Sequence, residues 1–284
     1  MPIDPRVICS TITLRHLPLD DALSTIAAGG FEEIDLGALP GVCDHVPYDL
    51  NDQAVQDVAT TVAASGLKVR SVNGDIGDLN KVLPPSGREA QRTHACRLFE
   101  LTKAIGGQAL VLPNGRQSHE PFDTIESDLD LVAHRLNGLA MDAADYGVQL
   151  WLEAPHWFRL AYNLERTEKL LKRLNPCIGV VCDVSHITAS GSTPRAFLDL
   201  FAERTRHVHI RDAEAGYIHH SVGNGEVDFS DLVACLTEYG YAGALALELE
   251  TRDVEDADRA DEAIRAAEYL SGLLTLPERA AARR

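Results

Sequence analysis

The chain repeats one pattern of hydrophobic and polar positions, in which a short apolar run precedes a longer stretch with apolar residues three or four positions apart. The short runs are typical of strands buried on both faces of a parallel sheet. The longer spacing is typical of a helix that buries one face. The predicted strands are Arg6–Ser10, Phe31–Leu36, Leu67–Val72, Gln108–Leu112, Gly147–Glu153, Ile178–Asp183, His207–Arg211 and Gly243–Glu248.

Turn residues separate these strands from the helices. Gly29-Gly30 and Ser65-Gly66 follow helical stretches, where glycine suits a left-handed C-terminal cap. Ser192-Thr193-Pro194 predicts a helix start, with a capping hydroxyl followed by a proline in the first turn. The clearest helical stretch is Phe122–Tyr146, and the glycine-containing segment Asp212–Val227 is expected to be a loop.

Eight predicted strands alternate evenly with eight helices, and no change in composition indicates a linker. Such alternation implies parallel strands joined by right-handed crossovers. We therefore predict an α/β protein, a single-domain (β/α)8 TIM barrel over residues 1–276, with a C-terminal tail at 277–284. An open doubly wound sheet is the alternative, but no Gly-x-Gly-x-x-Gly follows the first strand.

The last four predicted strands carry Glu153, Asp183, His209 and Glu248 at or near their ends. The C-terminal strand ends of a barrel surround one active site, so these side chains should meet there. Buried carboxylates must be paired or bound to a metal. Three oxygen donors and one imidazole suit one divalent ion, Mn²⁺ before Mg²⁺, Co²⁺ or Zn²⁺. Structural ion pairs are the alternative, and His207 points the same way as His209, one layer deeper.

The composition narrows the range of partners. The net charge of −17, from 26 basic and 43 acidic side chains, opposes nucleic-acid binding, and the basic residues form no cluster. Six scattered cysteines without a Cys-x-x-Cys pair indicate reduced thiols. With no leader sequence and no long apolar segment, we expect a cytoplasmic protein without a membrane partner. Glu250 is expected to be a loop-facing charge.

Several motifs resemble the xylose isomerase-like TIM-barrel superfamily of sugar phosphate isomerases and epimerases, which includes ketose 3-epimerases, inosose dehydratases and type IV apurinic endonucleases. The resemblance implies that Glu153, Asp183, His209 and Glu248 bind the metal. It also implies that His186 touches the substrate and that the loop after the seventh strand closes over the site. It further implies a homo-oligomer, a dimer or a tetramer. The matching segments are Asp183-Val-Ser-His186, His209-Ile-Arg-Asp212, His220-Ser-Val-Gly-Asn-Gly225 and Gly240-Tyr-Ala-Gly-Ala-Leu-Ala-Leu-Glu248.

The sequence departs from two branches of this superfamily. Ser71-Val-Asn73 and Leu112-Pro-Asn114 stand where the endonuclease branch needs extra zinc-binding histidines, and Tyr217-Ile-His219 lacks its acidic ligand. These differences and the negative charge disfavour an apurinic endonuclease. Ala215 stands where ketose 3-epimerases usually carry an arginine, which another arginine would have to replace.

We therefore interpret the protein as a divalent-metal-dependent sugar isomerase or epimerase. It would act on a keto-sugar or related polyol through a metal-stabilised enediolate, and the resemblance makes Glu153 and Glu248 its acid/base pair. The alternative is a metal-dependent lyase or dehydratase with His156 as the acid or base. That enzyme would perform β-elimination on a 3-keto-sugar, a keto-glycoside or an inosose. A barrel that binds without catalysis is a third hypothesis.

The small-molecule carbohydrate substrate should contact residues that follow the strands. Trp157 and Phe158 would form an apolar wall, although His156 could equally pack beside Trp157. Single histidines and asparagines are also ordinary loop residues, so each assignment is a hypothesis. The candidate substrate-binding residues are His45, Asn114, Arg159, His186, Arg211 and His220.

Overall fold

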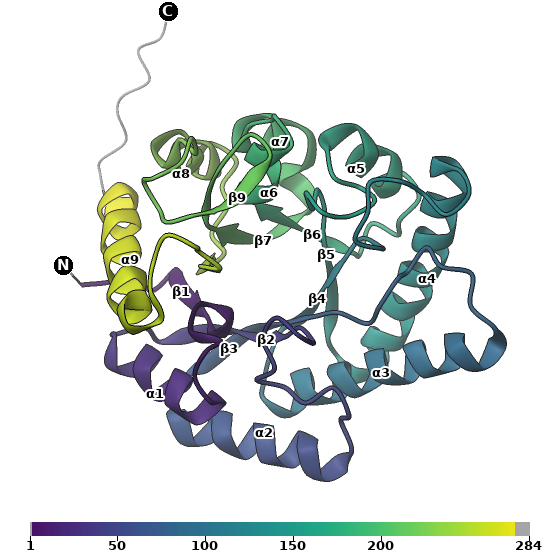
Figure 1. The fold of residues 1–284 in the computed structure, drawn as a ribbon, viewed down its shortest axis with the longest axis horizontal. Coiled ribbons are helices and arrows are strands. Elements are labelled where there is room, and N and C mark those ends of the chain that lie inside the picture. The colour runs from purple at the N-terminus through teal and green to yellow at the C-terminus, as the bar shows by residue number, and fades with distance from the viewer. Residues whose placement is uncertain (1, 276–284) are drawn as a thin grey trace, which may run out of the picture.

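The computed structural model describes residues 2–275. Within this range, parallel strands close into an eight-stranded barrel in the order β1-β10-β7-β6-β5-β4-β3-β2, and helices surround it (Figure 1). The prediction of a single (β/α)8 barrel is confirmed. The predicted tail at 277–284 lies outside the described residues.

The observed elements begin and end close to the predicted bounds. The barrel strands are β1 (Val7–Ser10), β2 (Glu33–Ala38), β3 (Lys68–Gly74), β4 (Ala109–Pro113), β5 (Gln149–Glu153), β6 (Gly179–Asp183), β7 (Thr205–Ile210) and β10 (Leu245–Leu247). The helices are α1 (Leu19–Ala28), α2 (Asp52–Ser65), α3 (Pro85–Ala104), α4 (Ile125–Tyr146), α5 (Leu164–Leu171), α6 (Val184–Ala189), α7 (Pro194–Phe201), α8 (Phe229–Glu238) and α9 (Arg259–Thr275).

Side chains at the helix ends explain why several helices start and stop where they do. Thr124 caps α4 by accepting a hydrogen bond from the Ser127 N–H, and Gly147 ends this helix with a φ of 74°. Thr193 caps α7 in the same way, ahead of Pro194 in the first turn, as the sequence predicts. These local signals fix the lengths of the helices that connect the barrel strands.

The segment 212–227, which we expected to be a loop, contains an antiparallel hairpin. Its strands are β8 (Asp212–Glu214) and β9 (Tyr217–His220), which turn at Gly216 with a φ of 80°. The strands are too short to produce a clear alternating pattern in the sequence. The hairpin follows β7 directly and packs against α6, at the end of the barrel where the strands terminate.

The barrel interior has apolar layers in its middle and polar layers nearer the C-terminal ends of the strands. One fully buried apolar group inside the barrel contains Trp151, Val111 and Val181, and another contains Ile8 and Ala246. Two positions after Trp151, Val181, Ile8 and Ala246 stand residues that are buried but polar, namely Glu153, Asp183, Ser10 and Glu248. Buried polar groups require partners, so the interior near the C-terminal strand ends must be satisfied by a network or a bound group. No helix within residues 2–275 has both the length and the apolar character needed to cross a lipid bilayer.

Two glycines of α4 allow a test of the backbone contribution alone. An added Cβ would meet no atom within 4 Å at either Gly138 or Gly147, but only Gly147 has a positive φ. We expect Gly138→Ala to raise the free energy of unfolding by ~0.5–1 kcal/mol, because alanine loses less entropy in a helix. Gly147→Ala should lower it by ~1 kcal/mol. Urea unfolding of both variants checks this, and a stabilising Gly147→Ala would contradict it.

Candidate metal and active site

Four side chains from neighbouring strands meet inside the C-terminal end of the barrel. Glu153 and Asp183 end β5 and β6, His209 lies on β7, and Glu248 directly follows β10. All four are buried, and one ligand atom of each lies within 4.8 Å of those of the others. The structure thus brings together the four residues that the sequence singled out, which we call the quartet.

One nitrogen of the quartet faces all three carboxylates. His209 Nδ1 lies 3.1 Å from Glu153 Oε1, 3.6 Å from Glu248 Oε2 and 3.8 Å from Asp183 Oδ2. Burial alone would lower the pKa of His209, but the carboxylates of Glu248, Glu153 and Asp35 raise it to about 10. The carboxylates therefore strongly favour a positive charge beside His209 Nδ1.

The donor set of the quartet fits a divalent cation. Asp183 Oδ1 accepts from the Ser185 hydroxyl and the Ser185 and His186 amides, whereas its buried Oδ2 has no hydrogen-bond partner in the described part of the chain. Burial raises the pKa of Glu153 and raises that of Glu248 further. A metal ion would stabilise the unpartnered oxygen of Asp183 and the charged forms of Glu153 and Glu248, which burial disfavours. Three oxygens and one imidazole suit Mn²⁺, Mg²⁺, Co²⁺ or Zn²⁺.

Each glutamate of the quartet keeps a second oxygen that faces a different partner. Glu248 Oε1 accepts a hydrogen bond of 2.7 Å from the Asn73 side chain. Glu153 Oε2 lies 3.5 Å from His156 Nε2. The two carboxylates are therefore not equivalent, because the second oxygen of Glu153 faces a titratable histidine and that of Glu248 faces an amide.

His156 and His186 stack with their ring centres 3.9 Å apart. The Trp157 amide donates to His186 Nδ1 and the Phe158 amide donates to His156 Nδ1, at 3.1 and 3.3 Å. Both rings must then carry any proton of the neutral form on Nε2. Burial and nearby positive charges hold the pKa of each histidine well below its usual value. Both therefore act as neutral N–H donors, and that of His156 faces Glu153.

Arg211 lies fully buried beside the carboxylates and is held from two sides. Its Nη1 donates to Glu250 Oε2 at 2.8 Å, while Nε and Nη2 donate to the Ser185 hydroxyl. Arg15 binds the other oxygen of Glu250 at 2.7 Å. The expectation that Glu250 is a loop-facing charge was wrong, because this carboxylate holds the arginine next to the quartet. Arg211 Nη2 lies 3.9 Å from Glu248.

Two of the predicted substrate-binding residues bind the protein itself. Arg159 donates to the Gly115 carbonyl at 2.6 Å and to Asp75 at 2.5 Å, which ties together the loops after β3, β4 and β5. The Asn114 amide donates to the Glu153 carbonyl and accepts from the Ala161 amide. These residues fix the backbone around Glu153, so in this structure their polar groups position the site.

Two of the histidines predicted to bind substrate, His45 and His220, have partners within the protein. His45 contacts the Leu17 carbonyl through Nε2 and the Cys43 thiol through Nδ1. His220 Nε2 faces Glu214 of its own hairpin at 3.5 Å.

The neighbouring His219, which sequence reasoning missed, has its ring parallel to Phe158 with centres 6.3 Å apart, and Phe158 in turn contacts His186. Adjacent residues of a strand face opposite sides, and here His219, not His220, faces Phe158. Trp157 and Phe158 line a cavity of about 420 Å³ together with residues 117–119.

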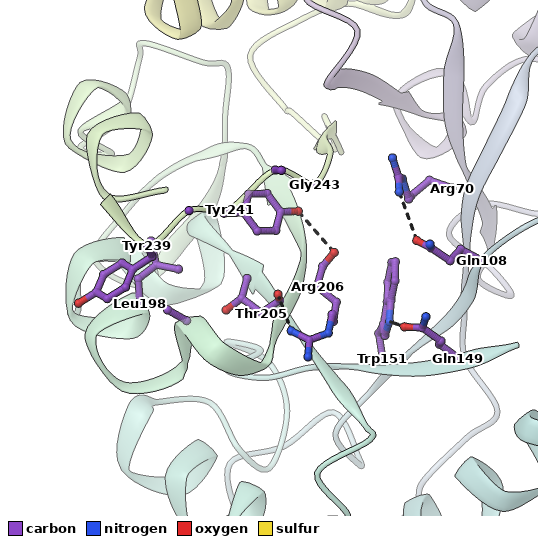
Figure 2. Close-up of a pocket in the computed structure, with 13 residues that line it drawn as sticks. Arg70, Gln108, Gln149, Trp151, Leu198, Thr205, Arg206, Tyr239, Tyr241 and Gly243 are labelled. Atoms are coloured by element: carbon purple, nitrogen blue, oxygen red, sulfur yellow. Dashed lines mark hydrogen bonds between the residues drawn. The ribbon is translucent and has the colours of Figure 1, made fainter. Parts of the chain in front are cut away.

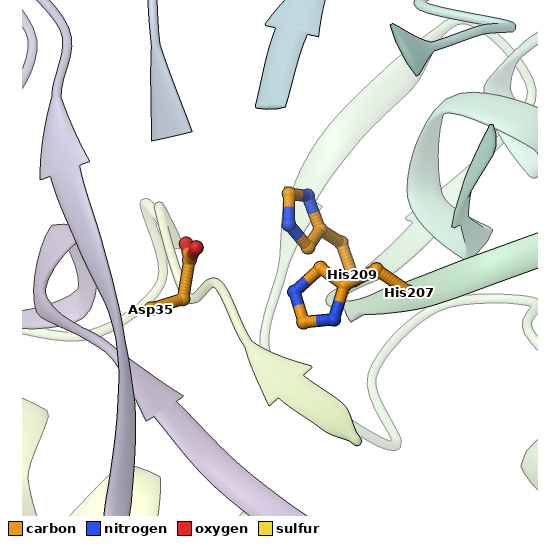
Figure 3. A group of neighbouring side chains, drawn as sticks. All are labelled: Asp35, His207 and His209. Atoms are coloured by element: carbon orange, nitrogen blue, oxygen red, sulfur yellow. The ribbon is translucent and has the colours of Figure 1, made fainter. Parts of the chain in front are cut away.

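Sequence reasoning also missed Asp35, a fully buried carboxylate on β2. It lies across the barrel interior from His207 and His209, with one ligand atom of each within 4.8 Å of the others (Figure 3). The hydroxyls of Ser10 and Ser71 donate to it at 3.0 and 2.6 Å. The available signal was an acid one residue before the end of the predicted apolar strand Phe31–Leu36.

His207 lies one layer deeper than His209, where the sequence placed it. Neither ring nitrogen of His207 has a hydrogen-bond partner within residues 2–275, and its ring lies against Trp151 with centres 5.4 Å apart. Burial holds the pKa of His207 well below its usual value, so the ring is neutral. His209 thus lies between the carboxylates of the quartet and the deeper polar side chains of Asp35 and His207.

The chain matches the xylose isomerase-like TIM barrel family over residues 23–271. Inosose dehydratase from Clostridium botulinum (strain Alaska E43 / Type E3) is 24% identical over 283 residues, a match that covers 88% of each protein. Several other curated relatives are matched over only about half of their own length.

Solved structures share the fold. The crystal structure of IolI protein with a bound zinc atom has a TM-score of 0.76 at 20% identity, covering 95% of this chain and 98% of that one. L-ribulose 3-epimerase has a TM-score of 0.76 at 18% identity, covering 95% of both chains. With the family match spanning most of its length, the chain belongs to the xylose isomerase-like TIM barrel family.

Proposed function

We propose that the protein is a divalent-metal-dependent sugar isomerase or epimerase that moves a proton next to the carbonyl of a keto-sugar or related polyol. The observation that carries this proposal is the pair of buried glutamates, each with one oxygen toward His209 Nδ1 and the other directed elsewhere. The quartet would hold the ion, Mn²⁺ by preference. When bound, it would supply electrostatic stabilisation of the enediolate charge.

Glu153 is the stronger candidate for taking the substrate proton. Burial raises the pKa of both glutamates and so makes each a better base than an exposed one, which leaves the neighbouring groups to favour Glu153. Its Oε2 lies 3.5 Å from His156 Nε2, so a second titratable side chain stands directly beside this carboxylate. Glu248, oriented by Asn73, would return a proton on the opposite face, which gives epimerisation.

The remaining polar and aromatic groups would bind the sugar. His186 Nε2–H is a neutral donor beside the quartet, 3.9 Å from Asp183 Oδ2. Trp157 and Phe158 offer apolar surface to the C–H face of a sugar at the adjoining cavity. Arg211, His45, Asn114, Arg159 and His220 remain candidate substrate residues, with their present protein contacts as the competing roles.

A lyase or dehydratase is the second candidate, and the contact between His156 and Glu153 favours it. Elimination requires a base for the proton and an acid for the departing hydroxyl or glycosyl group. Glu153 would be the base, and His156, whose Nε2 lies 3.5 Å from it, would have to be protonated to act as the acid. The curated relative named inosose dehydratase, 24% identical, supports the same candidate.

Metal binding by the quartet is tested with Asp183→Asn, which keeps the Oδ1 acceptor that caps α6 but removes the charge. After dialysis and reconstitution with Mn²⁺, wild type should hold about one ion per chain by mass spectrometry of the metal, and Asp183→Asn and Glu153→Gln should bind at least ~10-fold more weakly. Asp145→Asn, on the exposed end of α4, is the control and should match wild type. Equal metal binding by all four proteins would contradict the proposal.

Incubation in D₂O separates proton transfer from elimination. With a ketose, an inosose and a 3-keto-glucoside as probes, an epimerase or isomerase introduces one solvent deuterium and leaves the carbon skeleton intact, as seen by NMR. A lyase instead produces an enone or releases the aglycone. If metal-loaded protein yields neither deuterium exchange nor elimination with any probe, both candidate functions are excluded for these substrate classes.

The role of His156 is tested with His156→Gln, which keeps a polar side chain but cannot transfer a proton. We expect elimination to fall by ~10²–10⁴-fold while deuterium exchange continues, because the acid is lost and the Glu153 base remains. His134→Gln, on an exposed position of α4, should leave both rates unchanged. Equal rates for wild type and His156→Gln would assign His156 a packing role.

A further inference from the structure

The opposite end of the barrel contains a second polar cavity. Its volume is about 390 Å³, and the residues that line it lie where the strands begin (Figure 2). The apolar layer around Trp151 therefore separates this cavity from the quartet. The side chains that matter for its chemistry are Arg70, Gln108, Gln149, Trp151, Arg206 and Tyr241.

Two β-bulges place arginines at this cavity. In the pairing of β2 with β3, Ile34 is opposite Val69 and Asp35 is opposite Ser71, which leaves Arg70 as the extra residue. Such an extra residue bends the strand and redirects its side chain.

The pairing of β6 with β7 is interrupted in the same way. Val180 is opposite Thr205 and Val181 is opposite His207, which leaves Arg206 unpaired. Two separate irregularities of the barrel therefore deliver one guanidinium each to the same cavity.

Arg70 lines the cavity, and one of its donors has no partner among the residues that the structure describes. Its Nη2 binds Glu33 at 3.0 Å and its Nη1 binds Gln108 Oε1 at 3.2 Å, while no described residue pairs with its buried Nε. Because Gln108 accepts through its oxygen, its NH₂ group remains available as a donor. Glu33 offsets the charge of this one arginine.

The other side of the cavity is also rich in donors. Gln149 accepts from the Trp151 indole N–H at 2.9 Å, which leaves the NH₂ of this glutamine free as well. Arg206 donates to the carbonyls of Glu203 and Thr205, and no carboxylate within residues 2–275 forms an ion pair with it. Within the described chain, the positive charge of this guanidinium is therefore not offset by a neighbouring carboxylate, unlike that of Arg70.

The chain leaves room for these groups at Gly179, whose φ is not positive. A Cβ at this position would lie 2.5 Å from Arg206 Cγ and 2.6 Å from Trp151 Cδ1. Glycine is therefore required by the close approach of these two side chains, and their placement is built into the barrel.

We propose that this N-terminal mouth of the barrel binds a small organic anion, a phosphate ester or a carboxylate, through Arg70 and Arg206 and the amide groups of Gln108 and Gln149. Guanidinium groups and amide donors are the groups that recognise such oxyanions. The cavity volume falls in the range that accommodates a small metabolite. This site is independent of the proposed sugar chemistry.

Calorimetric titration at constant ionic strength tests the site, with inorganic phosphate, glycerol 3-phosphate and malonate as probes. EDTA keeps the protein metal-free, so no probe can bind through an ion at the quartet. We expect saturable binding of at least one probe at one site per chain. Tighter binding of glycerol 3-phosphate than of inorganic phosphate would identify an organic phosphate as the ligand class, and tighter binding of malonate would identify a carboxylate.

Arg206→Gln should weaken the affinity by about tenfold or more, the loss expected for one charge-assisted contact. Gly179→Ala, which displaces the Arg206 stem, should weaken it in the same direction. Arg252→Gln makes the same charge change at an exposed position beside β9 and should bind as wild type does. Circular dichroism verifies that each variant is folded. Absence of saturable binding to wild type, or equal affinity in Arg206→Gln, would overturn the proposal.

Discussion

The convergence of three desolvated carboxylates on one imidazole nitrogen is the constraint on which the C-terminal half of the barrel depends. Removing Glu153, Asp183 and Glu248 from water costs several kcal/mol per ion unless positive charge compensates them. His209 supplies the nearest compensation, and Arg211 adds a second cation 3.9 Å from Glu248. The proton that these carboxylates hold on His209 marks the place that a metal ion would take, because ion and proton compete for the same nitrogen.

Much of the surrounding structure holds these groups in place. Asp183 is at once a member of the quartet and the cap of α6, the helix that carries His186. A single carboxylate therefore determines both the position of a ligand atom and the direction of a neighbouring N–H donor. Asn114 performs a related task on the other side, because it binds the backbone at Glu153. Residues that look like sugar-binding groups in the sequence thus have a structural role as well.

The sequence was sufficient for the fold and for the quartet because both follow from strictly periodic features. Alternating strands and helices predict a barrel, and the strand ends of a barrel share one face. What the sequence could not provide is the pairing of side chains distant in the chain. Glu250 is the partner of Arg211, and Asp35 lies opposite His207, only because the barrel closes. His219 faces the site and His220 does not because a short hairpin forms within the expected loop.

The bulge at Arg206 has a consequence for the far end of the same strand. Thr205 faces outward, where its hydroxyl binds the Phe201 carbonyl, whereas His207 faces the interior, although two residues apart they would normally share a face. The extra residue therefore reverses the parity of β7 and turns His209 inward. A strand of regular alternation starting from the same Thr205 would present the imidazole to the helices instead. The extra residue that places Arg206 at the N-terminal mouth thus also determines which side chains of β7 face the candidate metal site.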